Sequence, residues 1–357
     1  MDNKSLSIGT WLKLTALGSP LVAGALDRLA RALPRRASEG PVADVVFVTP
    51  PKPAQGWILD AICREIGTRL PGLDVRYCAF GTPLPASRRY FFSHYMYYVG
   101  SLSRLRPFRL GQSHVFATHL EASKHGVSDE MLARLLNTSD SIICMNDALR
   151  DRLASLGVEP NRLSVSVGAA SAAVYRPHPR RADGKVGFCS AYYPRKSPDL
   201  VLEVVRAMPH RKFVLLGKGW DAYPRFAELC ALPNFELVDT TYEHYPAFYA
   251  QMSVFISASQ LEGGPIPLLE AMMSNAVPVA SRTGFAPDVI EHGKNGFLFD
   301  IGTPAAQVCA LVERAFELDC AVDETVRHCD WVPYAAKIAD RMGIRAPQAA
   351  ITALKPA

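Results

Sequence analysis

Short apolar runs alternate with helix-forming segments through most of this chain. Continuous runs rich in β-branched and aromatic residues stand at 45–48, 115–117, 213–216 and 253–259. Such runs are typical of strands that are buried on both faces of a parallel sheet. Helix formers lie between or after these runs, at 57–69, 200–208 and 267–273. The alternation of strand and helix predicts an α/β protein with doubly wound sheets.

A polar, proline-rich stretch at 176–184 interrupts this alternation. It fits neither the helical nor the strand period, as is typical of an interdomain linker. A chain of 357 residues is also too long for one ordinary domain. We therefore expect an N-terminal domain at 41–175, a linker at 176–184 and a C-terminal domain at 185–330, followed by a final helix and tail at 331–357.

Residues 1–40 precede the first predicted strand and are expected to form an extension. The part at 12–26 is moderately apolar, but Lys13, Gly18 and Pro20 interrupt it. It is also shorter than the roughly 20 apolar residues that a bilayer core requires. Arginines follow it, which does not suit a secretory signal peptide. An amphipathic helix at a membrane surface and a mobile extension both remain open.

Composition and charge narrow the function classes. The net charge is +5 and the sequence pI is near 8.7, but the chain has no long Lys/Arg block and no RNA-binding aromatic motif. We therefore expect no nucleic-acid partner. A mildly basic surface suits phosphate-bearing ligands or the anionic face of a membrane. The eight cysteines include no C-x-x-C pair, which indicates buried thiols in a reducing compartment rather than disulfides or a zinc site.

The most specific chemical signal lies between Glu262 and Glu270. These carboxylates flank a turn with Gly263 and Gly264, which follows the run at 253–259 and opens a helix. Glycines admit a ligand, and the helix N-terminus turns its N–H groups and positive dipole end toward it. Glu270, about one turn into the helix, could accept two vicinal ribose hydroxyls. The pattern predicts a nucleotide-sugar site, although a plain strand-to-helix turn could also contain these residues.

Residues 253–300 resemble the signature of the retaining glycosyltransferases of family four, which have the GT-B fold. The matching elements are the two-glutamate turn at 262–270, a helix end made of small residues at 271–276, an apolar strand at 277–280 and a final segment at 295–299 in which a glycine precedes apolar residues. The resemblance covers roughly 44–340. It implies two Rossmann-like domains that face a central cleft, an acceptor domain followed by a donor domain. The C-terminal helix is expected to cross back to the first domain.

The resemblance also assigns roles outside this segment. The family has a histidine at a strand end of its first domain that contacts the donor sugar from the other domain, and His119 follows the run at 115–117. A family lysine holds the donor diphosphate, and Lys196 stands at that position. The family's usual arginine is replaced by Ser190, and Arg195 is expected to supply the missing charge.

Glycines complete the predicted donor site. The first-domain loop of the family usually carries a glycine pair near the transferred sugar, and this chain keeps Gly56 alone. Gly217 ends the run at 213–216 and brings backbone to the nucleotide side of the second sheet. Glu262 is expected to orient the hydroxyls of the donor sugar, and with His119 it forms the predicted catalytic pair.

Together these residues predict a retaining, metal-independent glycosyltransferase. The sequence has no D-x-D pair to hold a divalent metal, so Lys196, Arg195 and the helix N-terminus would stabilise the departing diphosphate. No cofactor is expected besides the donor substrate, a nucleotide-diphosphate sugar. The resemblance implies a carbohydrate or lipid-linked acceptor and a role in bacterial polysaccharide or glycolipid synthesis. The protein is expected in the cytoplasm, with peripheral contact to the inner face of the membrane left open.

Other functions fit part of the pattern. Ser190 and the single Gly56 also suit a catalytically weak protein that binds nucleotide sugar or helps to assemble a complex. A GT-B sugar-nucleotide epimerase would share the fold. A hydrolase is disfavoured, because Glu262 and Glu270 come from one turn and its own helix. The segment at 83–109, with its cluster of aromatic residues, suits acceptor recognition, membrane contact or a buried core.

Overall fold

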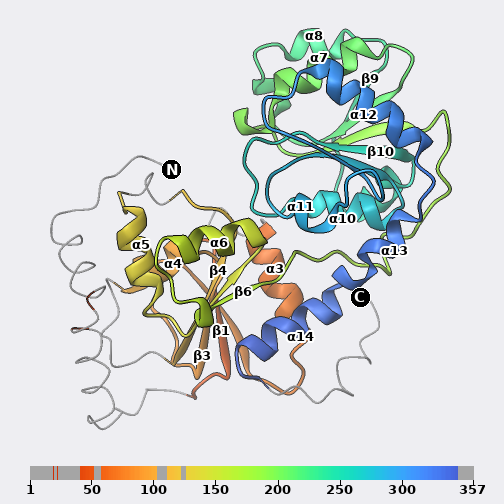
Figure 1. Ribbon diagram of the computed structural model, residues 1–357. Helices are drawn as coiled ribbons and strands as arrows, with labels where there is room; N and C mark the ends of the chain where they lie inside the picture. Colours follow the sequence, from red (N-terminus) through yellow and green to blue (C-terminus); the bar gives the residue numbers. More distant parts are fainter. Residues whose placement is uncertain are drawn as a thin grey trace. The chain divides into compact units, whose positions relative to one another are not determined.

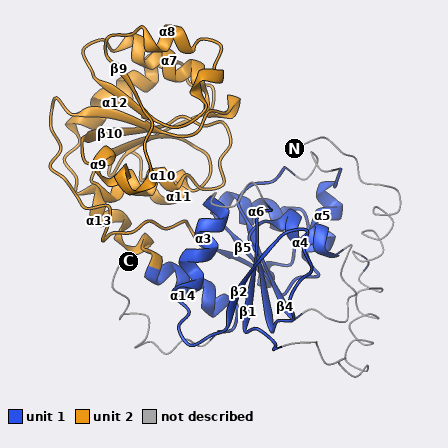
Figure 2. Ribbon diagram, turned by 180° about the vertical axis from the view of Figure 1, so that it is seen from behind, with its two compact units in different colours: residues 1–166, 332–357 blue, residues 167–331 orange. Residues whose placement is uncertain are grey.

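The chain forms two compact units, residues 1–166 with 332–357 and residues 167–331 (Figure 2). The computed structural model describes residues 41–51, 58–102, 111–121 and 126–344, together with Ser19 and Val22. Three features predicted from the sequence lie outside the described residues: nearly all of the N-terminal extension, the loop with Gly56, and the tail after residue 344.

The first unit is built on a parallel six-stranded sheet in the order β2-β1-β3-β4-β5-β6. Its strands are β1 (Val45–Thr49), β2 (Val75–Ala79), β3 (Arg89–Phe92), β4 (Gln112–Ala117), β5 (Ser141–Cys144) and β6 (Leu163–Val165). β1 pairs in parallel with β2 on one edge and with β3 on the other, so the strand order reverses at β1. In open α/β sheets, ligands bind off the carboxyl ends of the strands at such a switch point.

Helices connect these strands and bury their apolar faces against the sheet. They are α3 (Ile58–Gly67), α4 (Tyr95–Leu102), α5 (Asp129–Leu136) and α6 (Asp147–Ser155). Two of them begin at side-chain caps: Ser128 Oγ accepts from the N–H of Met131 at 3.2 Å, and Asn146 Oδ1 accepts from that of Leu149 at 2.7 Å. Such caps satisfy N–H groups that the helix itself leaves without partners.

The aromatic stretch at 90–98 belongs mainly to the core of this unit. The fully or almost fully buried members are Tyr90, Phe91, Phe92, Tyr95 and Tyr98. His94 is partly exposed and stacks on Tyr95 with the ring centroids 4.3 Å apart. Of the interpretations that the sequence left open, the buried core is therefore correct for these five side chains.

The second unit repeats the architecture with a parallel six-stranded sheet in the order β12-β11-β10-β7-β8-β9. Its strands are β7 (Lys185–Cys189), β8 (Phe213–Leu216), β9 (Phe235–Val238), β10 (Met252–Ser257), β11 (Val277–Ser281) and β12 (Phe297–Phe299). β7 pairs with β8 on one edge and with β10 on the other, which makes the β7–β10 boundary the switch point of this sheet.

Helices cover both faces of the second sheet. They are α7 (Pro198–Ala207), α8 (Phe226–Cys230), α9 (Tyr245–Tyr249), α10 (Ile266–Met273), α11 (Ala286–Val289), α12 (Ala305–Glu317) and α13 (Val322–Val326). α7 and α12 lie on one face, and α10 and α11 lie on the other (Figure 1). The predicted α/β class, with two doubly wound parallel sheets, is therefore confirmed.

The last described helix, α14 (Trp331–Arg341), leads back into the first unit. Its apolar side chains Ala335 and Ile338 are buried. Arg89 of β3 donates from Nε to the carbonyl of Met342 at 2.7 Å and from Nη2 to that of Gly343 at 3.2 Å. These contacts confirm the prediction that the C-terminal helix crosses back to the first domain.

The segment at 176–184 lies within the second unit. Arg180 donates to the carbonyls of Leu318 and Cys320 at 2.9 and 2.8 Å. The backbone N–H of Arg181 donates to Ser253 Oγ at 2.9 Å. This polar stretch is thus tied by hydrogen bonds to β10 and to the end of α12.

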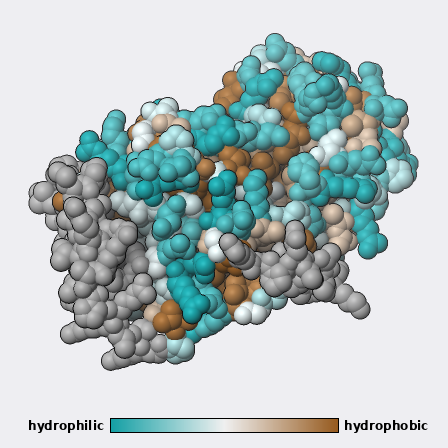
Figure 3. All heavy atoms as spheres, turned by 60° about the horizontal axis from the view of Figure 1, so that its bottom comes forward, coloured by the Kyte–Doolittle hydropathy of each residue, from teal (hydrophilic) through white to brown (hydrophobic). Residues whose placement is uncertain are grey.

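The surface of the described residues has both hydrophilic and hydrophobic areas. Hydrophilic residues cover much of the face drawn in Figure 3, with smaller hydrophobic groups between them. Among the described helices, none has the length and apolar character needed to cross a bilayer. All eight cysteines are free thiols, and four of them are buried. Cys230 is exposed, so the prediction that the cysteines are buried is wrong for this residue.

Candidate functional site

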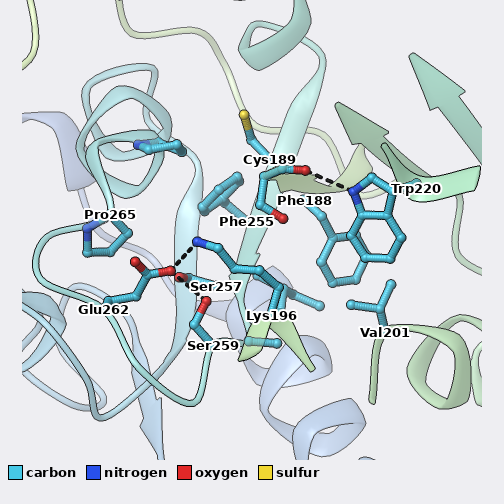
Figure 4. A pocket seen from close by; sticks show the side chains of 14 residues that line it. Phe188, Cys189, Lys196, Val201, Trp220, Phe255, Ser257, Ser259, Glu262 and Pro265 are labelled. Atoms are coloured by element: carbon cyan, nitrogen blue, oxygen red, sulfur yellow. Dashed lines mark hydrogen bonds and ion pairs between the residues drawn. The ribbon is translucent and has the colours of Figure 1, made fainter. Parts of the chain in front are cut away.

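The loops after β7 and β10 meet at the switch point of the second sheet. They line a small cavity of about 40 Å³ together with Trp220, and Lys196 and Glu262 face each other at its wall (Figure 4). The backbone N–H of Gln260 donates to the carbonyl of Arg195 at 2.7 Å, which joins the two loops directly. The site therefore lies where ligands bind in open parallel sheets.

Glu262 is the centre of a compact polar network. Its side chain is only 8% exposed, and its Oε1 accepts from Lys196 Nζ in an ion pair. Ser259 Oγ donates to the same Oε1 at 2.6 Å, so both side chains point to one carboxylate oxygen (Figure 4). The backbone N–H of Glu262 donates to Thr283 Oγ1 at 3.0 Å. A nearly buried carboxylate is tolerated here because it is both paired and hydrogen-bonded.

Arg195 lies beside this pair and forms a longer ion pair with the same carboxylate. Its Nη1 donates to the carbonyl of Leu261 at 2.8 Å and lies 3.8 Å from Glu262 Oε2. Its guanidinium also lies over the ring of Tyr193, 5.3 Å from the centroid. The 3-10 turn Pro194–Lys196 therefore brings both cations to the Glu262 turn.

Gly263 and Gly264 separate Glu262 from α10, as the sequence indicates. The N-cap residue of α10 is Pro265, which makes no side-chain cap. Pro265 and Pro267 have no N–H, so the amides at this helix opening come from Gly263, Gly264 and Ile266. These groups and the positive end of the helix dipole are suited to an anion or to sugar hydroxyls.

Gly217 has a packing reason for being glycine. A Cβ at this position would lie 1.8 Å from the carbonyl oxygen of Ser190. The same oxygen accepts from Trp220 Nε1 at 2.8 Å. The end of β8 and the loop after β7 can therefore approach closely only because residue 217 lacks a side chain.

Glu270 has a different environment from Glu262. It is 2% exposed, and its carboxylate accepts from three tyrosine hydroxyls. Tyr175 and Tyr242 donate to Oε1 at 2.9 and 2.7 Å, and Tyr249 donates to Oε2 at 2.8 Å. Burial raises the pKa of Glu270, while the three hydrogen bonds act in the opposite direction. The carboxylate expected at a ribose is thus already surrounded by hydroxyl groups of the protein.

Sequence reasoning did not identify the side chains that complete these two networks. Ser259, Thr283, Tyr175, Tyr242 and Tyr249 come from separate loops and helices. A local hint exists only for Ser259, which lies three residues before Glu262 and donates to it. The others reach their partners through the tertiary fold.

In the first unit, His119 lies just after β4, at the carboxyl end of the sheet. Its Nδ1 is 3.1 Å from Thr118 Oγ1, and its Nε2 is 3.4 Å from Glu121 Oε2. The N–H of Glu121 donates to the hydroxyl of Tyr95 at 2.8 Å, which fixes the loop to α4. The imidazole is 21% exposed, so part of the ring is open to solvent.

No group of three or more His, Cys, Asp or Glu side chains in the described ranges is arranged to hold a metal ion. The cationic side chains at the site are Lys196 and Arg195. Anion binding here would rest on these cations and on the amides at the start of α10.

Comparison with known proteins agrees with this geometry. Residues 183–315, most of the second unit, match the family model described as glycosyl transferases group 1. An uncharacterized glycosyltransferase of Methanocaldococcus jannaschii is 22% identical over 220 residues, 59% of this chain and 61% of the relative. The sulfoquinovosyl transferase of Arabidopsis thaliana is 30% identical over 110 residues, 30% of this chain and 22% of the relative. The matches thus span less than two thirds of either relative.

A solved structure covers more of the chain. The Anabaena protein HepE in complex with UDP-glucose aligns with a TM-score of 0.68 and 14% sequence identity, over 84% of this chain and 99% of that one. At this identity the likeness concerns the fold. The comparisons thus agree on two points: the second unit contains a region that matches the glycosyl transferases group 1 model, and the chain has the GT-B fold.

Proposed function

We propose that this protein is a retaining glycosyltransferase that moves a sugar from a nucleotide-diphosphate sugar to an acceptor without a metal ion. The observation that carries the proposal is the pairing of Lys196 with Glu262 beside a glycine turn and a helix N-terminus. These residues lie within the region that matches the family model. At the switch point, Lys196 would provide positive charge for the diphosphate, and Glu262 would provide an acceptor for the hydroxyls of the sugar.

The donor is proposed to be a UDP-sugar. The fold of this chain is similar to that of HepE, whose structure was solved with UDP-glucose. Lys196 would bind the diphosphate as a point charge, and Arg195 would add a second positive charge from the same turn. Ser190 cannot supply the charge that the family's usual arginine provides, so diphosphate binding depends on these two side chains.

The reaction breaks the bond between the sugar's anomeric carbon and the β-phosphate oxygen. A new bond forms between that carbon and an acceptor oxygen on the same face, and the departing diphosphate takes up the acceptor's proton. Lys196 and the helix opening at Gly263 and Gly264 would stabilise the charge on the leaving group. Glu262 would orient the sugar hydroxyls, and His119 would contact the sugar. The absence of D-x-D from the sequence supports metal independence.

The acceptor is proposed to be a carbohydrate or a lipid-linked saccharide, in bacterial polysaccharide or glycolipid synthesis. A nucleotide-sugar donor is a cytoplasmic metabolite, so we propose a cytoplasmic protein that can work at the inner face of the membrane. The proposed domain roles follow the same scheme: 41–175 for the acceptor and 185–330 for the donor.

The test is a turnover assay with a panel of UDP-, GDP-, ADP- and dTDP-sugars and mixed oligosaccharide and lipid-linked acceptors, with divalent ions chelated by EDTA. The proposal predicts that one donor yields an α-linked product from an α-linked donor and releases its nucleoside diphosphate. A product of inverted configuration, or turnover that EDTA abolishes, would contradict it.

A second function is favoured by one observation: Ser190 stands where the family usually has an arginine. Its carbonyl is engaged by Trp220, and Arg195 is engaged by the carbonyl of Leu261. A chain with this reduced charge could bind nucleotide sugar without turnover. The same assay separates the two: affinity for a donor with no product from any acceptor indicates a binding protein, and an altered donor sugar without acceptor indicates an epimerase.

A further inference from the structure

Tyr242 differs from the other tyrosines that bond to Glu270. Tyr175 is 2% exposed and Tyr249 is 0% exposed, whereas Tyr242 is 61% exposed. Even so, its hydroxyl donates to Glu270 Oε1 at 2.7 Å. Two of the three donors are thus core residues, and the third reaches the buried carboxylate from the surface.

Tyr242 lies in a short turn at the surface of the second unit. It begins the short 3-10 turn Tyr242–His244, which lies between β9 and α9 and is followed by the helix that carries Tyr249. Figure 2 shows α9 beside α10, the helix of Glu270. The ring of Tyr242 packs on that of Tyr245 with the centroids 4.9 Å apart. Because most of its surface is already in water, turning it outward costs little burial.

The carboxylate of Glu270 has limited capacity for further donors. An ionised carboxylate offers about four lone-pair sites on its two oxygens. Tyr175 and Tyr242 occupy Oε1, and Tyr249 occupies one site on Oε2. A vicinal diol brings two hydroxyls at once, so one protein hydroxyl has to leave, and Tyr242 is the exposed one.

We propose that Tyr242 is a specificity-determining residue, whose hydroxyl holds Glu270 in the free protein and is exchanged for a ribose hydroxyl when the donor binds. This inference rests on the proposed function, in which Glu270 receives the ribose of a nucleotide sugar. A ligand with both vicinal hydroxyls exchanges one bond to Glu270 for two and so gains one. A 2′-deoxyribonucleotide presents a single hydroxyl, takes the remaining place on Oε2 and also gains one, so Tyr242 narrows the difference in affinity between the two kinds of nucleotide.

The experiment is calorimetric titration of UDP and 2′-deoxy-UDP into the full-length wild-type chain, Tyr242→Phe and Tyr245→Phe. The phenylalanine at 242 keeps the ring but no longer competes for Glu270. Tyr245→Phe is the matched control, since Tyr245 packs on Tyr242 in the same turn of chain. We expect Tyr242→Phe to bind UDP about fivefold more tightly, the value of one net hydrogen bond. Its affinity for 2′-deoxy-UDP should change much less, and Tyr245→Phe should match the wild type with both ligands.

The outcomes separate this inference from the function on which it rests. If UDP binds the wild type but Tyr242→Phe binds it equally or more weakly, Tyr242 does not compete with the ribose and the inference is wrong. An equal gain for UDP and 2′-deoxy-UDP would also overturn it, because the gain would then not come from a second ribose hydroxyl that takes the place of Tyr242. If neither UDP nor any other nucleoside diphosphate binds the wild type, the proposed donor site itself fails, and this inference fails with it.

Discussion

The ammonium group of Lys196 donates a hydrogen bond to the carboxylate of Glu262, which lies 66 positions further along the sequence. This ion pair connects the loops that follow β7 and β10. The two strands are neighbours in the sheet although β8 and β9 separate them along the chain. A parallel sheet whose order reverses at this point brings both loops to the same edge. The pair is therefore a consequence of topology as much as of residue type.

Glu262→Gln should separate sugar positioning from nucleotide binding. The amide keeps the shape of the side chain but cannot form the ion pair with Lys196 or accept on both oxygens. If Glu262 orients the donor sugar, kcat should fall about 100-fold, because misplacement of the reacting group has a cost of that order. Affinity for UDP alone should change little. Steady-state kinetics with calorimetry on the same preparation measures both, and equal losses in kcat and UDP affinity would contradict this role.

His119→Ala tests the proposed contribution of the first unit. The imidazole is held by Thr118 and lies 3.4 Å from Glu121. Losing a positioned imidazole is expected to reduce kcat by at least about 10-fold. UDP affinity should be retained, because the proposed groups for the diphosphate lie in the second unit. His210→Ala, which removes an exposed histidine paired with Glu313, is the control. A full-rate His119→Ala enzyme would exclude His119 from the site.

Gly217→Ala should destabilise the second unit more than an ordinary glycine substitution. The added methyl would lie 1.8 Å from the Ser190 carbonyl, so backbone has to shift. We expect a loss of about 2–4 kcal/mol in the free energy of unfolding. Thermal unfolding followed by circular dichroism measures the difference.

Gly293→Ala is the matched comparison. Its φ is +82°, and a Cβ there would meet nothing within 4 Å, so the change adds backbone strain without a clash. That strain should cost about 1–2 kcal/mol. If Gly217→Ala is as stable as Gly293→Ala, the close approach to Ser190 does not constrain residue 217.

His114 predicts a specific pH dependence of stability. It is 3% exposed, its Nδ1 lies 2.8 Å from Ser141 Oγ, and its Nε2 has no hydrogen-bond partner in the part of the chain that the structure describes. Burial lowers the pKa of this imidazole from 6.5 to about 4, and the charge of Arg89 acts in the same direction. Between these values the unfolded chain binds a proton that the folded chain does not.

Stability should therefore be unaffected by His114 above pH 6.5 and should fall as the pH drops from 6.5 toward 4. The full loss is about 3 kcal/mol, the free energy that corresponds to a shift of this size. His114→Gln, which cannot take up the proton, should lose less stability over this range in urea unfolding of the first unit. Identical pH profiles for His114→Gln and the wild type would contradict the account.

Much of the fold could be predicted from sequence because its strands are locally distinctive. The run at 253–259 corresponds to β10 (Met252–Ser257), and the helix formers at 267–273 correspond to α10 (Ile266–Met273). Strands buried on both faces require continuous apolar residues, and the helices between them carry strong helix formers, so local pattern and tertiary structure agree. The return of the last helix to the first unit could be anticipated only through the family resemblance.

The site was less accessible to sequence reasoning. The turn with Glu262, Gly263 and Gly264 is local and could be recognised. The tyrosines on Glu270 could not, because Tyr175 lies 95 positions away and Tyr249 lies 21 away. Hydrogen bonds at such separations depend on how the loops and helices around the sheet pack together, which residue type and spacing do not encode.

The most direct test of the central claim is calorimetric titration of UDP into the wild-type chain, Lys196→Ala and Lys294→Ala. Lys294 forms an ion pair with Glu291 on the surface and is 71% exposed, so its removal controls for the loss of one positive charge. We predict that Lys196→Ala weakens UDP binding by about 2 kcal/mol, or about 30-fold in Kd, the value of a hydrogen bond to a charged group. Lys294→Ala should bind like the wild type. Equal affinity in all three proteins, or no binding of UDP or any other nucleoside diphosphate to the wild type, would contradict the assignment of this site to a nucleotide-sugar donor.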